Sequence, residues 1–173
     1  DLDPSHTADD PRVRRIKNPT SHHDAYDAAM RTPELLDIVS ALLRPDLRFD
    51  HSKLNFKPPS GSAAVEWHQD WAFYPHTNDD ILAIGVMLDD CPADNGPLLA
   101  VPGSHKGPVW DHHTDGYFCG ALDPAATDLD YGSARALTGK AGSVTIHHVR
   151  AVHGSTENRS DALRRLLLLS YAA

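Results

Sequence analysis

Cysteine and long apolar runs are what this sequence has least of. Only Cys91 and Cys119 occur in 173 residues, and their spacing fits no metal-binding motif. This excludes a disulfide framework and a cysteine-based zinc site, and it favours a reducing compartment. No apolar stretch has the length of a membrane span, and neither end resembles a targeting peptide. We therefore expect a soluble, cytoplasmic protein without a membrane partner.

An excess of positive charge is also missing. The chain has 16 basic and 24 acidic residues, which gives a formal net charge of -8. Nucleic-acid binding through phosphate neutralisation is therefore not expected, and the expected partner is a small molecule. Histidine is instead abundant, with 12 residues, and its neutral ring is the commonest metal ligand in proteins. The length suits a single domain with its own core and leaves the oligomeric state open.

Residues 1–50 are expected to form a polar segment followed by a helix. Residues 1–28 are polar and show no sustained period, which predicts irregular structure. In residues 32–43, apolar side chains recur at helical spacing. Thr32 suits the N-cap, and Pro33 suits the first turn. We therefore predict one amphipathic helix that ends before Pro45.

Residues 51–173 are expected to form the catalytic core, built from short strands separated by turn residues. The expected strands are residues 52–57, 65–71, 81–88, 98–101, 143–148 and 163–171. This texture favours an antiparallel sandwich or barrel over alternating strands and helices. Residues 162–169 are also rich in helix formers, so a terminal helix is the alternative there. Residues 106–140 show little pattern, and we expect a lid or a disordered loop.

A histidine and a carboxylate lie two positions apart, at His68 and Asp70. If residues 65–71 form a strand, both side chains project from one face and can bind one ion. His153, from a distant strand, is the candidate for a third ligand. Two histidines and one carboxylate leave positions open on a metal for a chelating cosubstrate and oxygen. Taken alone, His68 and Asp70 could equally be two ordinary surface residues that bind no metal. The other histidines considered are expected to be structural or solvated: His105, His112, His113, His147 and His148.

Arg164 lies in an apolar run, eleven positions after His153. Burying a guanidinium is costly unless it meets a carboxylate, which it can bind through two hydrogen bonds. The distal carboxylate of 2-oxoglutarate would serve, and a structural salt bridge is the alternative. Neighbours in a strand face opposite sides, so only one of Arg164 and Arg165 should point inward. Spacing alone does not choose between them.

Four stretches together resemble the phytanoyl-CoA dioxygenase family of 2-oxoglutarate-dependent oxygenases, which includes ectoine hydroxylase. They are residues 54–58, residues 67–70 (Trp-His-Gln-Asp), the region from Asn95-Gly96-Pro97 to Lys106, and His153-Gly154-Ser155 with Arg164. The resemblance covers about residues 50–172. It implies a mainly β fold with flanking helices, namely a double-stranded β-helix, which is a jelly-roll or cupin-like barrel. Family members usually extend further at both ends, so the chain is compatible with a fragment.

The same resemblance implies a site for iron(II), 2-oxoglutarate and O2. The implied metal ligands and catalytic residues are His68, Asp70 and His153. The implied cosubstrate contacts are Arg164, Ser155 and Asn55, with Lys57 as an addition. The implied activity is hydroxylation, or another oxidation, of an unactivated C–H bond of a small metabolite, with conversion of 2-oxoglutarate to succinate and CO2. A cupin-type metal barrel without oxygenase activity and an inactive binding module are the alternatives.

Two further features bear on the reaction and its substrate. In related halogenases a small residue replaces the carboxylate ligand, so the presence of Asp70 favours hydroxylation. The scarcity of clustered Lys and Arg leans away from a coenzyme A ester and toward a small metabolite. The residues that follow the ligand pair would line a substrate pocket or belong to the core: Trp71, Phe73 and Tyr74, with His76 as a polar candidate.

Overall fold

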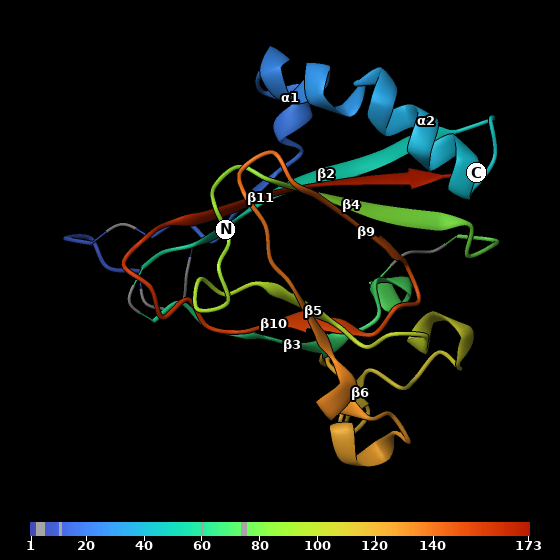
Figure 1. The fold of residues 1–173 in the computed structure, drawn as a ribbon. Coiled ribbons are helices and arrows are strands. Elements are labelled where there is room, and N and C mark those ends of the chain that lie inside the picture. The colour runs from blue at the N-terminus through green and yellow to red at the C-terminus, as the bar shows by residue number, and fades with distance from the viewer. Residues whose placement is uncertain (3–5, 11, 60, 74–75) are drawn as a thin grey trace.

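The computed structural model describes residues 1–2, 6–10, 12–59, 61–73 and 76–173. Two antiparallel sheets face each other, and two helices cover the outer side of the larger sheet (Figure 1). The strand order is β1-β2-β11-β4-β9 in the larger sheet and β3-β10-β5-β8 in the smaller one. Neighbouring strands are therefore often far apart in sequence, as in a jelly-roll fold.

The larger sheet consists of β1 (Arg15–Lys17), β2 (Arg48–Lys57), β11 (Arg164–Ala172), β4 (Ile81–Met87) and β9 (Val144–His148). The smaller sheet consists of β3 (Val65–His68), β10 (His153–Ser155), β5 (Leu98–Ala100) and β8 (Arg135–Leu137). A separate hairpin joins β6 (His113–Thr114) to β7 (Tyr117–Phe118). The helices are α1 (Asp24–Met30) and α2 (Pro33–Leu42), and the 3-10 turns are η1 (Pro19–Ser21), η2 (Asp70–Phe73), η3 (Ser104–Lys106), η4 (Pro124–Ala126) and η5 (Tyr131–Ser133).

Helix α2 begins and ends close to where the sequence predicts. Thr32 is its N-cap and Pro33 is its first residue. Its buried residues, Leu35 and Val39, pack on the larger sheet in the main hydrophobic cluster. The strand residues of that cluster are Leu54, Leu82, Ile84, Leu167, Leu169 and Tyr171. The main core therefore lies between the helices and the larger sheet, which leaves the opposite face of this sheet free to form a site.

Strand β11 explains the apolar run near the end of the sequence. It pairs with β2 on one side and with β4 on the other, so it is central in the sheet. Leu167 and Leu169 face the helices, whereas Leu166 and Leu168 pack with Met87 and Cys91 in a second cluster. Both faces are buried, so polar residues do not alternate with apolar ones. The predicted strand is confirmed, and the alternative of a terminal helix is excluded.

The prediction of irregular structure for residues 1–28 is wrong, because this segment contains β1 and α1. Strand β1 has three residues and is held by pairing with β2, about 40 positions away, so no local pattern marks it. Helix α1 has no fully buried residue, and only Tyr26, Ala29 and Met30 pack, partly buried, against the main core, so its apolar stripe is short. The predicted strand over residues 65–71 is also too long, because β3 ends at His68 and η2 begins at Asp70.

Residues 106–140 are mostly loop and carry two elements that the sequence did not indicate. One is the β6–β7 hairpin, and the other is β8, which pairs with β5 and completes the smaller sheet. Cys91 and Cys119 are both free thiols. Within the part of the chain that the structure describes, no helix combines the length and apolar character of a membrane span.

Candidate metal centre

His68 and His153 are brought together by the pairing of β3 with β10. The two residues lie directly opposite each other in this antiparallel register, and their ring centroids are 4.2 Å apart. Asp70 follows the end of β3, where the chain turns into η2. The prediction that His68 and Asp70 project from one face of a strand is therefore wrong, although their side chains do lie close together. A turn after the strand, rather than strand alternation, directs the carboxylate toward both imidazoles.

The ligand atoms of His68, Asp70 and His153 all lie within 4.8 Å of one another. Nε2 of His68 is 3.9 Å from Oδ1 of Asp70, and Nε2 of His153 is 3.8 Å from Oδ2. Among the described residues, no hydrogen bond reaches the Asp70 side chain, whose nearest cationic or imidazole nitrogen is 3.6 Å away. Asp70 is only 5% exposed. A buried carboxylate without hydrogen bonds is costly, and a bound cation would remove that cost.

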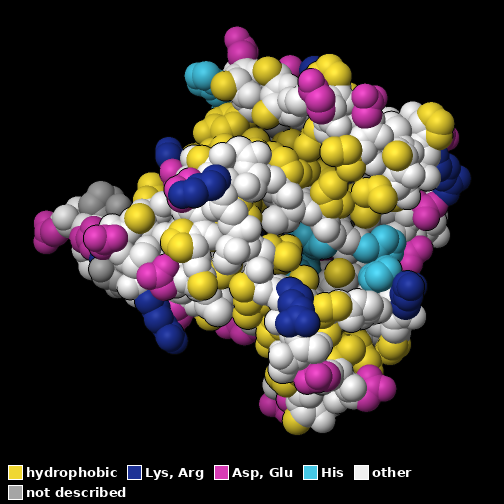
Figure 2. Space-filling model, in the orientation of Figure 1, with side chains coloured by type: hydrophobic (Ala, Val, Ile, Leu, Met, Phe, Trp, Pro, Cys, Tyr) yellow, Lys and Arg dark blue, Asp and Glu magenta, His cyan; other side chains and the backbone are white. Residues whose placement is uncertain are grey.

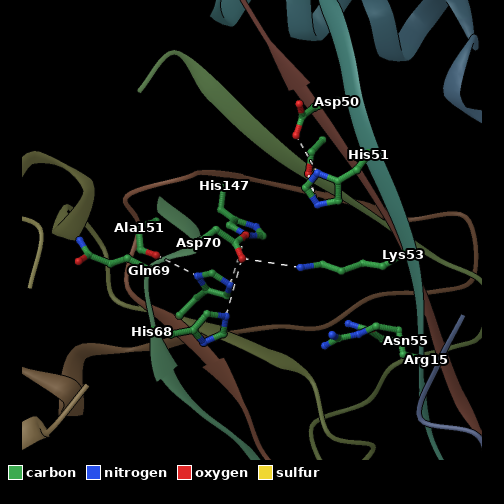
Figure 3. A network of polar contacts seen from close by, with 12 residues as sticks. Arg15, Asp50, His51, Lys53, Asn55, His68, Gln69, Asp70, His147 and Ala151 are labelled. Atoms are coloured by element: carbon green, nitrogen blue, oxygen red, sulfur yellow. Dashed lines mark hydrogen bonds and ion pairs between the residues drawn. The ribbon is translucent and has the colours of Figure 1, made fainter. Parts of the chain in front are cut away.

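Backbone carbonyl groups fix both imidazole rings. Nδ1 of His68 donates to the carbonyl oxygen of Glu66 over 2.8 Å, and Nδ1 of His153 donates to that of Ala151 over 2.9 Å. Because Nδ1 carries the proton, Nε2 of each ring keeps its lone pair. Both lone pairs belong to atoms that lie beside Asp70 (Figure 3). Two neutral nitrogens and one carboxylate are the donor set that non-haem iron(II) takes.

Burial also sets the charge of these groups. Burial holds the pKa of His153 well below its usual value, and it lowers the pKa of His68 as well. Burial acts to raise the pKa of Asp70, but Lys53, His153 and His147 together outweigh it, so the pKa of Asp70 lies well below its usual value. The histidines are thus neutral and the aspartate is ionised near neutral pH, as metal binding requires.

Gln69, between the two ligands, is fully buried and anchors the ligand turn to the following loop. Its side-chain nitrogen donates to the carbonyl oxygens of Pro108 and Arg150, and its side-chain oxygen accepts from the Trp110 backbone. Its backbone nitrogen donates to Nε2 of His112 over 3.0 Å. The sequence left open whether His112 is structural or solvated, and this hydrogen bond shows that it is structural. The sequence alone did not indicate a role for Gln69.

His147 lies closer to the candidate metal ligands than the sequence indicates. It is buried on β9, its Nε2 is 3.6 Å from Oδ2 of Asp70, and its ring centroid is 4.4 Å from that of His153. Neither of its ring nitrogens has a hydrogen-bond partner among the described residues. It is therefore not solvated. Its place on the cavity side of β9 depends on the register with β4, which no local pattern reveals.

Two cavities share lining residues at the candidate metal ligands His68 and Asp70. The inner chamber lies between the two sheets, and the residues that line it and not the outer cleft include Asn55, Lys57, Ser155 and Arg164. The outer cleft opens toward residues 119–121 and has a volume of about 710 Å³. Six residues line both cavities: Arg14, Arg15, Lys53, Val65, His68 and Asp70. Figure 2 shows histidine side chains at the surface between the upper and lower layers of the molecule.

Arg164 is the inward-facing arginine of the adjacent pair. It is 5% exposed, and its Nη2 donates to the carbonyl oxygen of Gly96 over 2.8 Å. Its Nε has no hydrogen-bond partner in the described part of the chain. Burial lowers the pKa of Arg164 to about 10, so it remains charged near neutral pH. Arg165 faces the other way and binds Asp89 at 2.6 and 3.0 Å. The parity argument from the sequence is confirmed.

Asn55 and Lys57 are two positions apart in β2, so both side chains point to the cavity side of this strand. Nζ of Lys57 donates to the carbonyl oxygens of Ala63, over 3.0 Å, and of Thr156. Burial, with the neighbouring charge of Arg164, lowers the pKa of Lys57 to about 7. The Asn55 side-chain oxygen accepts a hydrogen bond from Nε of Arg15 over 3.0 Å. Ser155 reaches the same chamber from β10, opposite Leu98.

The expected substrate-contacting residues lie in different places. Phe73 lines the outer cleft and packs edge-on against His68. Trp71 packs against the cluster of Ile81, Val149 and Ala172 and is not among the described residues that line either cavity. His76 lies beside Asp50 at 3.5 Å, likewise outside both linings. Tyr74 lies outside the described residues. Phe73 is the one of the three described positions that reaches a cavity.

Comparison with known proteins links this geometry to one family. A profile of phytanoyl-CoA dioxygenase (PhyH) matches residues 2–166. The chain is 48% identical over 165 residues to a probable alpha-ketoglutarate-dependent hypophosphite dioxygenase of Stutzerimonas stutzeri. This match covers 93% of this chain and 57% of that protein. It is 32% identical over 166 residues to an L-proline trans-4-hydroxylase of Streptomyces griseoviridis. This match covers 82% of this chain and 60% of that protein.

Solved structures give the same result. EctD from S. alaskensis, determined with 2-oxoglutarate and 5-hydroxyectoine, has a TM-score of 0.80 and 26% identity to this chain. The match covers 95% of this chain and 58% of that one. The predicted double-stranded β-helix is thereby confirmed. The chain spans little more than half of the length of the curated relatives it matches. On the profile match and these identities, the chain belongs to the phytanoyl-CoA dioxygenase family.

Proposed function

We propose that this chain forms the catalytic core of an iron(II)- and 2-oxoglutarate-dependent dioxygenase that oxidises a small molecule. The observation that carries the proposal is the position of Arg164. This buried cation faces the same inner chamber as the cluster of two histidines and one carboxylate. In the described part of the chain it forms no ion pair with a carboxylate. A dianionic keto acid would satisfy the metal at one end and the guanidinium at the other.

His68, Asp70 and His153 would hold the iron. Their donor set fits the ion, because two Nε2 lone pairs and an ionised carboxylate meet around one point. The backbone carbonyls behind the rings hold both histidines in the tautomer that binds metal, without any further adjustment. Three protein ligands leave the remaining coordination positions for cosubstrate and oxygen.

Arg164 and Ser155 would hold the distal carboxylate of 2-oxoglutarate, with Asn55 and Lys57 at the chamber wall. When bound, iron and 2-oxoglutarate together supply oxidation by O2, in which one oxygen atom enters succinate, CO2 is released, and the other oxygen atom enters the substrate. The protein orients both molecules and excludes water. None of these residues is required to act as a general base.

The substrate is proposed to be a small molecule rather than a long acyl thioester. The relatives are named for hypophosphite and for L-proline, which are both small. The oxidised bond is then a P–H bond, as in hypophosphite, or an unactivated C–H bond, as in proline. Phe73 and residues 119–121 line the outer cleft together with cationic residues of β1 and β2. The substrate would enter through this cleft.

Replacing Arg164 by glutamine is expected to weaken 2-oxoglutarate binding about 10- to 100-fold, because a charge-assisted bidentate contact is lost. The measurement is an anaerobic titration of the iron(II)-loaded protein with 2-oxoglutarate, followed by the weak visible charge-transfer band of the chelate. Arg165→Gln is the matched control, since Arg165 binds Asp89 on the outer face and should leave the affinity unchanged. Unchanged affinity in Arg164→Gln, with metal still bound, would favour a metal-binding cupin without keto-acid chemistry.

Shortening the β6–β7 hairpin is expected to change turnover of substrate and to spare the binding of iron and 2-oxoglutarate. Phe118 packs against Phe73 at a centroid distance of 5.2 Å, and residues 119–121 line the outer cleft. Replacing residues 114–117 by two glycines leaves both the Gln69 anchor and β8 in place. The checks are the KM for substrate, the coupling of succinate to product, and the two binding constants. An equal loss of all of them would reject a lid function.

A further inference from the structure

His147 is a buried polar side chain for which neither the fold nor the three proposed metal ligands account. Its side chain is 4% exposed, and it lines the inner chamber. Neither Nδ1 nor Nε2 has a hydrogen-bond partner among the described residues. Burying a polar group without a partner costs free energy, so such groups are few in folded proteins. We therefore expect His147 to find a partner when the site is occupied.

The strand β9 fixes the direction in which this ring points. His147 lies opposite Ala83 of β4, whose small side chain leaves space for the imidazole. The next residue, His148, points to the other side of the strand, where its ring centroid is 5.7 Å from that of His105. His148 is not among the described residues that line either cavity. The backbone pairing of β9, rather than hydrogen bonds of its own ring, therefore places His147 at the chamber wall.

The Asp70 carboxylate is the acceptor within reach of the His147 ring. Nε2 of His147 is 3.6 Å from Oδ2 of Asp70. An N–H to oxygen hydrogen bond has a length of about 2.9 Å, so a small rotation of either side chain would join the two groups. Figure 3 shows the His147 ring next to the carboxylate, with His68 on the other side of the carboxylate in this view.

His147 does not belong to the group of residues that could hold the ion itself. In the described part of the chain, the side chains whose ligand atoms all lie within 4.8 Å of one another are His68, Asp70 and His153. The His147 ring packs beside that of His153, at a centroid distance of 4.4 Å. His147 thus stands one step outside the ligands and can act on the metal through Asp70.

The two oxygens of Asp70 have different neighbours. Oδ1 lies 3.9 Å from Nε2 of His68 and 3.7 Å from Nζ of Lys53. Oδ2 lies 3.8 Å from Nε2 of His153 and 3.6 Å from Nε2 of His147. A carboxylate binds a metal through one oxygen or through both. In a site with two histidines and one carboxylate, the second oxygen would occupy a coordination position that such sites keep open.

We propose that His147 is a positioning residue that donates a hydrogen bond from Nε2 to Oδ2 of Asp70 when the metal is bound, so that the carboxylate binds through Oδ1 alone. The proposal deepens the proposed function and rests on it. An imidazole donates this hydrogen bond in its neutral form, so it adds no positive charge beside the cation. Residues that hydrogen-bond a ligating carboxylate fix its orientation, and their loss typically weakens metal binding about 10- to 100-fold.

Three variants separate the hydrogen bond from the bulk of the side chain. His147→Phe keeps a ring without a donor, and it is expected to weaken iron(II) binding about 10- to 100-fold. His147→Gln places an amide nitrogen near the position of Nε2 and should retain most of the affinity. His147→Asn places its amide near Nδ1, which is not the nitrogen that faces Asp70, so its affinity should resemble that of His147→Phe. The measurement is anaerobic equilibrium binding of iron(II).

Two further measurements distinguish this role from a purely structural one. The visible charge-transfer band of the chelate of iron(II) with 2-oxoglutarate should shift in His147→Phe, because the coordination of Asp70 changes, and His147→Gln should restore its position. The melting temperature of metal-free His147→Phe should equal or exceed that of the wild type, because two unpartnered nitrogens leave the interior. His148→Phe is the matched control. It makes the same change on the opposite side of β9 and should leave iron affinity and the band unchanged.

Three results would overturn the proposal. One is wild-type iron affinity with an unshifted band in His147→Phe. Another is an equal loss of iron affinity in His147→Gln and His147→Asn, and this comparison also decides the matter if His147→Phe does not fold. The third is a loss of iron affinity in His148→Phe that equals the loss in His147→Phe. A wild-type protein without iron binding or without the band of the chelate would instead contradict the proposed function, so the two failures are distinguishable.

Discussion

Replacing Asp70 by alanine is expected to weaken iron(II) binding more than about 100-fold and to abolish turnover. The estimate is a lower bound, because removing a residue that only orients a ligand already costs about 10- to 100-fold in metal affinity. Asp70 supplies the one carboxylate of the cluster, and both histidine Nε2 atoms lie within 4 Å of it. The measurement is anaerobic equilibrium binding of iron(II), together with succinate formation in the presence of 2-oxoglutarate.

The fold should survive this substitution. The contacts of the Asp70 carboxylate with nitrogen atoms are 3.6 to 3.9 Å long, so it contributes ionic attraction rather than hydrogen bonds to the metal-free protein. Removing it also removes the cost of burying its charge. Circular dichroism and the melting temperature of the metal-free variant should therefore stay close to wild type. Asp90→Ala, at an exposed ion pair, is the control. Wild-type iron affinity in Asp70→Ala would reject the assigned metal site.

The three residues of the proposed metal site could be picked out from the sequence, but the geometry that brings them together could not. The His68 and Asp70 pair and the later His153 matched a family pattern of short motifs. Strand alternation was the wrong explanation, because a strand that ends at His68 and turns into a 3-10 helix looks the same in sequence as one that continues. The turn is fixed by Gln69, whose hydrogen bonds to Pro108 and Arg150 span 39 and 81 positions.

The expectation that only one of two adjacent arginines points inward followed from a simple physical rule, since adjacent strand residues face opposite sides. The choice between Arg164 and Arg165 did not, because it depends on where Asp89 lies, and that carboxylate comes from the end of a distant strand. Lys53 illustrates the same limit. Its period-two spacing with Asn55 and Lys57 was visible in the sequence, but its approach to Asp70 depends on how the two sheets face each other. Charge alone would have classed it as a surface lysine.

Residues 1–28 gave the least signal in sequence, and yet they contribute to the cavities. Arg14 and Arg15 line both of them, and β1 pairs with β2 through Arg15 opposite Asn55. An edge strand of three residues carries too few side chains for a periodic pattern. Its position is set by the backbone of β2, so local propensity cannot reveal it. The substrate side of the site is therefore harder to predict from sequence than the metal side.

Replacing Gly154 by alanine is expected to destabilise the protein by about 1–3 kcal/mol and to weaken metal binding at the same time. A Cβ at this position would lie 2.7 Å from the Val65 carbonyl oxygen and 3.3 Å from that of Glu66. Both atoms belong to the backbone of β3, so they cannot move aside as a flexible side chain would. The register of β10 and β3 already shifts between His153 and Ser155.

Separation of these strands would carry His153 away from His68, and it would also disturb the Glu66 carbonyl that holds Nδ1 of His68. The glycine between His153 and Ser155 is thus required by close strand contact rather than by its conformational freedom. The measurements are thermal unfolding of the metal-free protein and iron(II) affinity. Gly103→Ala is the informative control, because Gly103 has φ of 79° with no neighbour within 4 Å of an added Cβ. Its strain should lower stability and leave metal affinity intact. Equal metal affinity in both variants would mean that the close approach of β10 to β3 does not position the ligands.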